Sequence, residues 1–300
     1  MPPDTNEMTK GLELTGAMRL KRCRHGTMLY NMNDLTIGRA LDRYGEFSEI
    51  EAAFMCGMIK PGDHVVEVGA NMGSLTVPLA NAVGPAGSLT AFEPQPILFQ
   101  NLCANVALNG FLHVRTINAA IGAELGSVRL PKLNFEKPGL FGAHGIGSNE
   151  DGDPCPVYKL DDILSLPSCK LMKIDVEGME ADVIRGSVEF IQQHRPILYV
   201  ENDRKEKSSE LIALLQEMDY ALYWHIPPLF NPKNFFGETV NDFGQMSSIN
   251  MLCAPQWMRV NDAGGYRISG PDEWWKDRVF SEEIHVDSAL DIFRDDPLRR

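Results

Sequence analysis

The segment HVVEVGANMG, residues 64–73, decides the fold of this 300-residue chain. Its first five residues form a short apolar run after the Pro-Gly-Asp turn at residues 61–63, which is typical of a buried parallel strand. Gly69 and Gly73 then bracket a turn, because glycine adopts backbone conformations that other residues avoid. Ser74 follows as a candidate N-cap for the next helix. Strand, glycine turn and helix in this order indicate the first unit of a doubly wound α/β sheet.

Strand and helix signals continue to alternate along the chain. Strands are expected at residues 88–92, 113–121, 171–176, 196–200, 220–226 and 248–254, and helices over 74–83 and 96–109, after residue 176 and over 206–219. This alternation predicts one mostly parallel, doubly wound sheet. The last two strands, joined by a Pro- and Phe-rich loop over 227–247, are expected to pair antiparallel at the end of the sheet. The core then covers 61–255, with an N-terminal extension over 1–60 that packs on it and an acidic C-terminal extension over 256–300.

The charge balance excludes some partners. The chain has 28 basic and 41 acidic residues, a net charge of −13, which disfavours nucleic acid and anionic membranes as partners. Six cysteines without a C-x-x-C pair suggest a reduced, cytoplasmic protein, and the N-terminus has no signal-peptide pattern. The nearly uncharged residues 68–114 contain several prolines and asparagines, which argues against a membrane span and for a sheet interior.

Two carboxylates stand close to the glycine turn. Glu93 is the only formal charge in residues 68–114 and follows the second strand, where it can accept hydrogen bonds from both ribose hydroxyls of a nucleoside. Glu67 lies inside the first strand, where a carboxylate would repel a pyrophosphate and suit a cationic ligand. The turn GANMG also lacks the second glycine of the GxGxxG dinucleotide fingerprint. The charges therefore favour S-adenosylmethionine over NAD, and an NAD-dependent oxidoreductase remains an alternative.

These motifs together resemble the FkbM family of S-adenosylmethionine-dependent methyltransferases. The resemblance covers roughly residues 40–255 and rests on EVGANMG at 67–73, FEP at 92–94 and KIDVEGME at 173–180, with GEFSE at 45–49 and PGD at 61–63 before them. It implies a class I methyltransferase fold, a Rossmann-like doubly wound sheet of seven strands with the last strand antiparallel. It also implies a small-molecule acceptor, a sugar or another hydroxylated metabolite, that is methylated on a hydroxyl oxygen.

The same resemblance assigns roles to residues at the carboxyl ends of the strands. The methionine and ribose part of the cofactor would contact Glu67, Gly69, Asn71 and Gly73, the ribose hydroxyls Glu93, and the adenine the region of Asn118 and Ala119. Asp175 is expected to contact cofactor or substrate.

Methyl transfer requires the acceptor oxygen, the methyl carbon and the sulfur in line, and a hydroxyl acceptor benefits from a base. The candidate catalytic residues are Asp175, Glu177 and Glu201, at the ends of the fourth and fifth strands. Glu177 could instead stabilise the start of the following helix. The three carboxylates could also converge on a divalent cation, which the sequence does not establish. His225 and His144 are weaker candidates for the base.

Two further questions stay open at this level. The aromatic residues Trp224, Phe230, Phe235, Phe236 and Phe243 could line an acceptor pocket, although core packing explains at least half of them. A methyltransferase-like module that only binds a partner is a third interpretation, which the intact glycine turn and Glu93 disfavour. The sequence does not indicate the oligomeric state.

Overall fold

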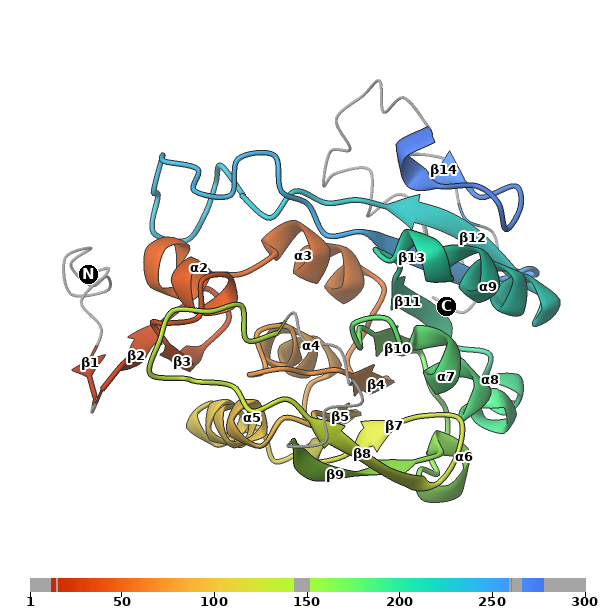
Figure 1. Ribbon diagram of the computed structural model, residues 1–300, viewed down its shortest axis with the longest axis horizontal. Coiled ribbons are helices and arrows are strands. Elements are labelled where there is room, and N and C mark those ends of the chain that lie inside the picture. Colours follow the sequence, from red (N-terminus) through yellow and green to blue (C-terminus); the bar gives the residue numbers. More distant parts are fainter. Residues whose placement is uncertain (1–11, 15, 143–151, 259, 261–265, 278–300) are drawn as a thin grey trace.

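A computed structural model describes residues 12–14, 16–142, 152–258, 260 and 266–277 (Figure 1). The helices and strands are β1 (Leu12–Glu13), β2 (Met18–Arg22), β3 (Thr27–Asn31), α2 (Ile37–Tyr44), α3 (Glu49–Gly57), β4 (His64–Val68), α4 (Thr76–Val83), β5 (Ser88–Phe92), α5 (Pro96–Leu108), β6 (Val114–Ile117), β7 (Ala120–Ile121), β8 (Gly126–Leu130), β9 (Asp153–Tyr158), α6 (Leu160–Ile163), β10 (Leu171–Ile174), α7 (Glu180–Arg185), α8 (Val188–His194), β11 (Ile197–Glu201), α9 (Lys205–Glu217), β12 (Tyr220–His225), β13 (Asn250–Pro255), β14 (Tyr266–Arg267) and a 3₁₀ turn, η1 (Trp275–Asp277). His144 and the acidic tail beyond residue 277 lie outside the described residues.

The main sheet has the order β14-β12-β13-β11-β10-β4-β5-β6. Strands β11, β10, β4, β5 and β6 pair in parallel, whereas β13 pairs antiparallel with both β11 and β12. The predicted class I sheet with an antiparallel last strand is therefore confirmed. The last two predicted strands, β12 and β13, pair antiparallel at the end of the sheet as expected, with β13 next to β11. One detail differs from the prediction: the two-residue β14 adds an eighth strand at the edge.

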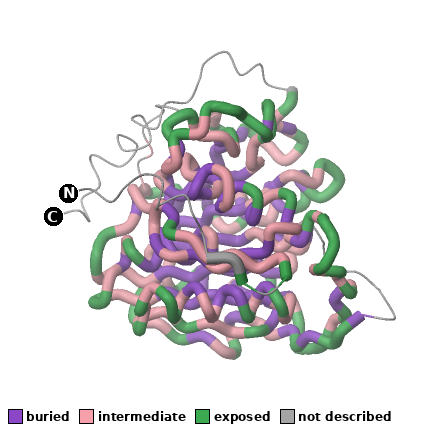
Figure 2. Tube along the Cα trace, turned by 90° about the vertical axis from the view of Figure 1, so that its left-hand side faces the viewer, coloured by how far each residue is buried: buried purple, intermediate pink, exposed green. Residues whose placement is uncertain are grey.

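Helices cover both faces of this sheet and enclose two hydrophobic cores. Neighbouring residues of one strand pack into the cores on opposite faces of the sheet, because side chains alternate across a strand. Val65 packs with Leu79 and Leu102 under helices α4 and α5, whereas the next residue, Val66, packs with Ile184 under α7. The strands are accordingly buried at the centre of the molecule (Figure 2). Burial on both faces explains why these strands are continuous apolar runs in the sequence.

The predicted third strand, residues 113–121, is wrong in its extent. The chain leaves the main sheet after β6 and starts β7, which joins β9 and β8 in a separate three-stranded sheet. This small sheet is absent from the sequence-based prediction, because three residues of β8 and three of β9 are exposed and β9 contains two prolines.

Two predictions about helices also need correction. Ser74 does not cap the first helix of the motif, since α4 begins at Thr76 without a side-chain cap. The helix predicted after the fourth strand is two helices, α7 and α8, separated by Gly186 and Ser187. Gly186 passes so close to another segment that a β-carbon on it would lie 1.9 Å from the backbone oxygen of Gly122. That close contact, rather than helix propensity, sets the break.

The N-terminal segment folds into a three-stranded sheet, β1-β2-β3, followed by α2 and α3. Helix α3 packs against α4. Ile37 from α2 and Glu51 from α3 line the main cavity together with Phe47 between the two helices. The segment therefore forms part of the wall of the candidate site.

Candidate active site

The glycine turn after β4 joins the ends of three strands. The backbone N–H groups of Gly69 and Ala70 both donate to the carbonyl oxygen of Phe92, at 3.0 and 2.9 Å, and the N–H of Asp175 donates to the carbonyl of Val68 at 3.0 Å. Gly69 has φ +84°, and a β-carbon there would lie 1.7 Å from the backbone oxygen of Asp175. Only glycine fits this position, because both the conformation and the contact exclude a side chain.

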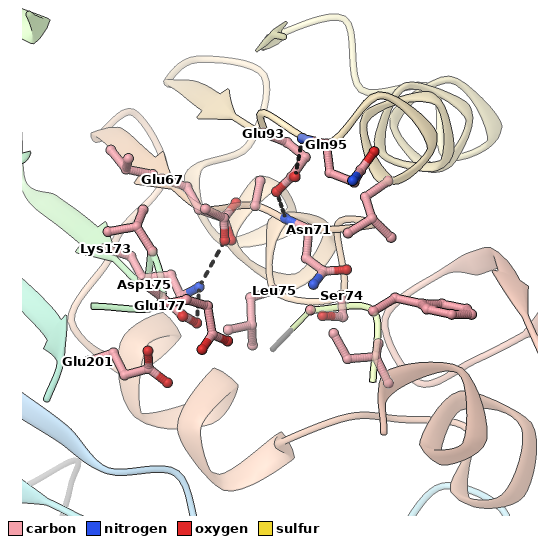
Figure 3. Close-up of a pocket in the computed structure, with 18 of the residues that line it drawn as sticks. Glu67, Asn71, Ser74, Leu75, Glu93, Gln95, Lys173, Asp175, Glu177 and Glu201 are labelled. Atoms are coloured by element: carbon pink, nitrogen blue, oxygen red, sulfur yellow. Dashed lines mark hydrogen bonds and ion pairs between the residues drawn. The ribbon is translucent and has the colours of Figure 1, made fainter. Parts of the chain in front are cut away.

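Glu93 is held against this turn by two backbone hydrogen bonds. Its Oε2 accepts from the N–H of Asn71 at 2.7 Å, and its Oε1 accepts from the N–H of Gln95 at 2.8 Å (Figure 3). The side chain lines the cavity although the residue is only 5% exposed. Burial raises the pKa of Glu93 to about 7, against the opposing effect of its hydrogen bonds. Asn71, with φ +53°, adopts a left-handed conformation that is uncommon outside glycine.

Of the other residues predicted to contact the cofactor, two do not line the cavity. The Asn118 amide donates to the backbone carbonyls of Glu93 and Pro94, at 2.8 and 2.9 Å, so it braces the end of β5 instead. Its neighbour Ala119 does line the cavity. Gly73 has φ +90° and packs against Leu102, so its role in the structure is to shape the turn.

A buried lysine lies among the carboxylates at the centre of the site. Lys173 donates to Asp175 Oδ2 at 3.0 Å and approaches the carbonyl oxygen of Gly69 at 3.4 Å (Figure 3). Asp175 and the nearby Glu67 and Glu51 raise the pKa of this ammonium group, outweighing the burial that would lower it. Lys173 is therefore protonated, and it links the fourth strand to the glycine turn.

Glu67 is fully buried beside this lysine. Its Oε2 accepts a hydrogen bond from Thr76 Oγ1 at 2.6 Å, whereas its Oε1 has no partner among the residues that the structure describes. Burial raises the pKa of Glu67 to about 7, and Lys173 only partly offsets this effect. An unpaired carboxylate oxygen at the cavity wall is a vacant place for a hydrogen-bond donor or a cationic group.

The three predicted catalytic carboxylates do come together. Each of Asp175, Glu177 and Glu201 has an oxygen that lies within 4.8 Å of the other two. Glu177 has φ +56° and forms an ion pair with Arg204, and burial and Asp175 raise its pKa to about 7. Such a backbone conformation is costly for a residue other than glycine and is found most often at functional sites. Glu177 therefore faces its neighbours rather than capping a helix.

Glu201 differs from the other two carboxylates because it lacks a cationic partner. Its Oε2 atom is buried and accepts no hydrogen bond within the described part of the chain. Burial, followed by the negative charges of Asp175 and Glu177, raises the pKa of Glu201 well above its ordinary value. The cluster could bind a divalent cation, but Lys173 and Arg204 already neutralise two of its three members. The metal therefore remains a prediction.

One cavity of about 280 Å³ contains these groups. Its described wall has six carboxylates (Glu51, Glu67, Glu93, Asp175, Glu177 and Glu201) and one basic side chain, Lys173. Apolar side chains complete it, among them Phe47, Leu98 and Phe141. The cavity thus combines a floor rich in carboxyl groups at the carboxyl ends of the strands with an apolar wall, and it suits a cationic ligand with an apolar part.

Sequence reasoning missed several residues of this wall. Glu51, which accepts a hydrogen bond from Ser48 Oγ at 2.7 Å, and Asn250 at the start of β13 are both buried at the cavity. Glu51 lies two residues after the GEFSE segment at 45–49, but neither spacing nor periodicity indicates that it turns inward. Asn250 carries no local signal at all.

The aromatic residues and His225 have other roles. None of the five aromatic residues named from the sequence lines the cavity, to which their loop contributes Leu229 and Met246 instead. His225 stacks on Phe54 and bonds the hydroxyl of Tyr199 at 2.7 Å. Burial lowers the pKa of His225 to about 3, so this imidazole is neutral. His225 also does not line the cavity.

The strand order and the acidic cavity at the carboxyl ends of β4, β5, β10 and β11 define a methyltransferase of class I. The chain belongs to the FkbM family, since the model of the "Methyltransferase FkbM domain" matches residues 67–222. The NAD-dependent oxidoreductase is thereby set aside. No helix among the described residues has the length and apolar character needed to cross a membrane.

Individual relatives are distant. The 31-O-demethyl-FK506 methyltransferase FkbM of Streptomyces tacrolimicus is 27% identical over 204 residues, covering 57% of this chain and 78% of that protein. Methyltransferase 1 of Beauveria bassiana (strain ARSEF 2860) is 28% identical over 144 residues, 41% of this chain and 57% of that protein. The structure of methyltransferase FkbM from Methylobacillus flagellatus KT aligns with a TM-score of 0.42 at 17% identity, over 64% of this chain and 43% of that one.

Proposed function

We propose that the protein is an S-adenosylmethionine-dependent methyltransferase that acts on a hydroxyl oxygen of a small metabolite. The observation that carries the proposal is the charge of the cavity, with six carboxylates against one lysine in its described wall. A sulfonium and an amino group are cationic, so the field of this cavity favours them and disfavours a pyrophosphate. The same field disfavours phosphorylated or carboxylated acceptors.

The residues of the glycine turn fit the cofactor. Glu93 uses one lone pair of each oxygen for the backbone of Asn71 and Gln95, which leaves acceptor capacity for two ribose hydroxyls. The free Oε1 of Glu67 supports a role in binding the methionine amino group. When bound, the cofactor supplies a methyl group activated by its attachment to a positively charged sulfur.

Glu201 is the base that the geometry supports best. Asp175 forms an ion pair with Lys173 and Glu177 forms one with Arg204, whereas Glu201 forms none with the residues that the structure describes. Burial and the neighbouring carboxylates raise the pKa of Glu201 well above its ordinary value, and a carboxylate with a raised pKa is a stronger base. We assign Asp175 and its partner Lys173 to the positioning of the turn and the substrate.

Calorimetry with S-adenosylmethionine, S-adenosylhomocysteine and NAD tests the first half of this proposal. We expect both sulfur compounds to bind and NAD not to bind. Absence of binding by both sulfur compounds would refute the cofactor assignment. Transfer of tritium from methyl-labelled S-adenosylmethionine to a panel of neutral sugars and polyketide alcohols, run beside carboxylated analogues, tests the second half. Binding without transfer to any hydroxyl compound would instead support a non-catalytic module.

A further inference from the structure

Three neighbouring strands place a row of polar residues at the edge of the sheet that carries the candidate catalytic carboxylates. In the register of the sheet, Glu201 of β11 is paired with Asn250 of β13, and Asn250 is paired with His225 of β12. Directly paired residues point to the same face of a sheet, with their β-carbons about 4.5–5.5 Å apart. Glu201 and Asn250 both line the cavity, whereas His225 does not. The two residues therefore present adjacent polar groups to the same space.

Both residues have a buried polar atom without a partner in the described part of the protein. Asn250 is 4% exposed, and its amide nitrogen Nδ2 has no hydrogen-bond partner of good geometry there. The Oε2 atom of Glu201 is likewise buried and unpaired. Buried polar atoms are seldom left unpaired, because each one loses its hydrogen bonds to water. One of these atoms is a donor and the other an acceptor, so a single ligand group could satisfy both.

The surroundings keep the Asn250 amide available. Burial raises the pKa of the nearby Tyr199 hydroxyl well above its ordinary value, and a hydrogen-bond interaction with the Asn250 side chain opposes this effect. The same hydroxyl bonds Nδ1 of the neutral His225 at 2.7 Å. An amide nitrogen carries two hydrogens, so one can face Tyr199 while the other faces the cavity.

We propose that Asn250 and Glu201 together bind the acceptor hydroxyl, with Nδ2 of Asn250 donating to its oxygen and Oε2 of Glu201 accepting its hydrogen. A hydroxyl group has one hydrogen and two lone pairs, so one lone pair remains free to attack. During transfer the bond between this oxygen and the methyl carbon forms and the bond between that carbon and the sulfonium sulfur breaks. The sulfur keeps the electron pair and becomes a neutral thioether, and the hydroxyl proton passes to Glu201. The inference rests on the proposed function and specifies its acceptor site.

The pair would also distinguish the substrate from its product. A methyl ether can accept a hydrogen bond from Asn250 but has no hydrogen to give to Glu201. Binding of the ether would leave the Glu201 carboxylate buried and unpaired again. A hydroxyl compound should therefore bind more tightly than its own methyl ether.

The test compares cyclohexanol with cyclohexyl methyl ether as probes of the protein saturated with S-adenosylhomocysteine. Ligand-observed NMR titration gives the two dissociation constants. The loss of one hydrogen bond to a charged group predicts that cyclohexanol binds the wild type at least about fivefold more tightly than the ether. Glu201→Ala should abolish this preference, and Asn250→Ala should weaken binding of both probes by about fivefold.

Asn202→Ala is the matched control, because Asn202 is also a buried asparagine, directly after β11, but its amide nitrogen donates a hydrogen bond to Ser208 Oγ at 2.9 Å. It should leave both probe affinities unchanged. Affinity for S-adenosylhomocysteine within about twofold of wild type shows that each variant is folded. Equal affinities of the two probes in the wild type, no binding of cyclohexanol up to about 100 mM, or unchanged probe binding in Asn250→Ala would each overturn the pair. Failure of the wild type to bind S-adenosylhomocysteine would refute the proposed function instead.

Discussion

The substitution Glu67→Gln should stabilise the ligand-free protein, and more strongly as the pH rises. Glu67 is fully buried and its pKa is about 7, against an ordinary value of 4.5. The folded state therefore holds a proton that the unfolded state has lost, and the free energy of unfolding falls as the pH rises from about 4.5 to about 7. At roughly 1.4 kcal/mol per pH unit, the raised pKa of Glu67 lowers the free energy of unfolding by ~3 kcal/mol near pH 8 but by only ~1 kcal/mol near pH 5. A glutamine does not ionise and still accepts the bond from Thr76.

Urea unfolding of wild type and Glu67→Gln near pH 5 and near pH 8 measures this effect. The gain in unfolding free energy should be ~2 kcal/mol larger near pH 8 than near pH 5. The difference between the two pH values removes any constant packing cost of the glutamine amide. Glu93→Gln is the contrasting variant, because both oxygens of Glu93 accept backbone N–H groups and an amide can replace only one of them. A gain for Glu67→Gln that does not change with pH would refute the reasoning.

Three further outcomes follow from the site. Glu93→Ala should weaken binding of S-adenosylhomocysteine at least about tenfold in calorimetry, because it removes the proposed ribose contacts and releases Asn71 and Gln95; unchanged affinity would remove Glu93 from the cofactor site. Gly69→Ala should lower the free energy of unfolding by more than ~3 kcal/mol, because the added β-carbon would lie 1.7 Å from the backbone oxygen of Asp175. Gly62→Ala is the control: Gly62 has φ +96° but a β-carbon there has no atom within 4 Å, so the loss should be only ~1 kcal/mol. Equal losses in the two variants would argue against the contact. Addition of about 10 mM MgCl₂ should shift the midpoint of thermal unfolding by less than about 2 °C, because two of the three clustered carboxylates already pair with cations; a larger shift that Glu201→Gln removes would indicate a metal site.

The parts of the fold that the sequence predicts well are those in which local pattern and final burial coincide. Strands β4, β5, β10 and β11 are buried on both faces, so each is a short apolar run between turn residues. Glu93 is conspicuous for the same reason, because a charge in an otherwise uncharged interior segment requires a role. The three candidate catalytic carboxylates could be expected at one edge because parallel strands have their carboxyl ends on the same side of a sheet.

The parts that escaped prediction depend on contacts between distant segments. Asn250 becomes part of the site only because β13 is inserted next to β11, in a register that places it beside Glu201. The interruption between helices α7 and α8 at Gly186 depends on the close approach of the Gly122 backbone, which is 64 positions earlier in the chain. The ion pairs of Lys173 and Arg204 likewise become visible only in three dimensions, and they distinguish Glu201 from two otherwise similar carboxylates.

The antiparallel direction of β13 has an evolutionary consequence. Strand β12 ends at the edge of the sheet where β13 begins, and the Pro228–Ser247 bridge joins the two ends of the connecting loop. Both ends of the loop are therefore anchored beside the cavity, and Leu229, Met246 and Ser248 form part of its wall. A parallel connection would have to return to the opposite edge, which would constrain its length. This loop can instead be lengthened, shortened or exchanged without altering the glycine turn that follows β4, so it is a natural place for the proposed acceptor preference to diverge.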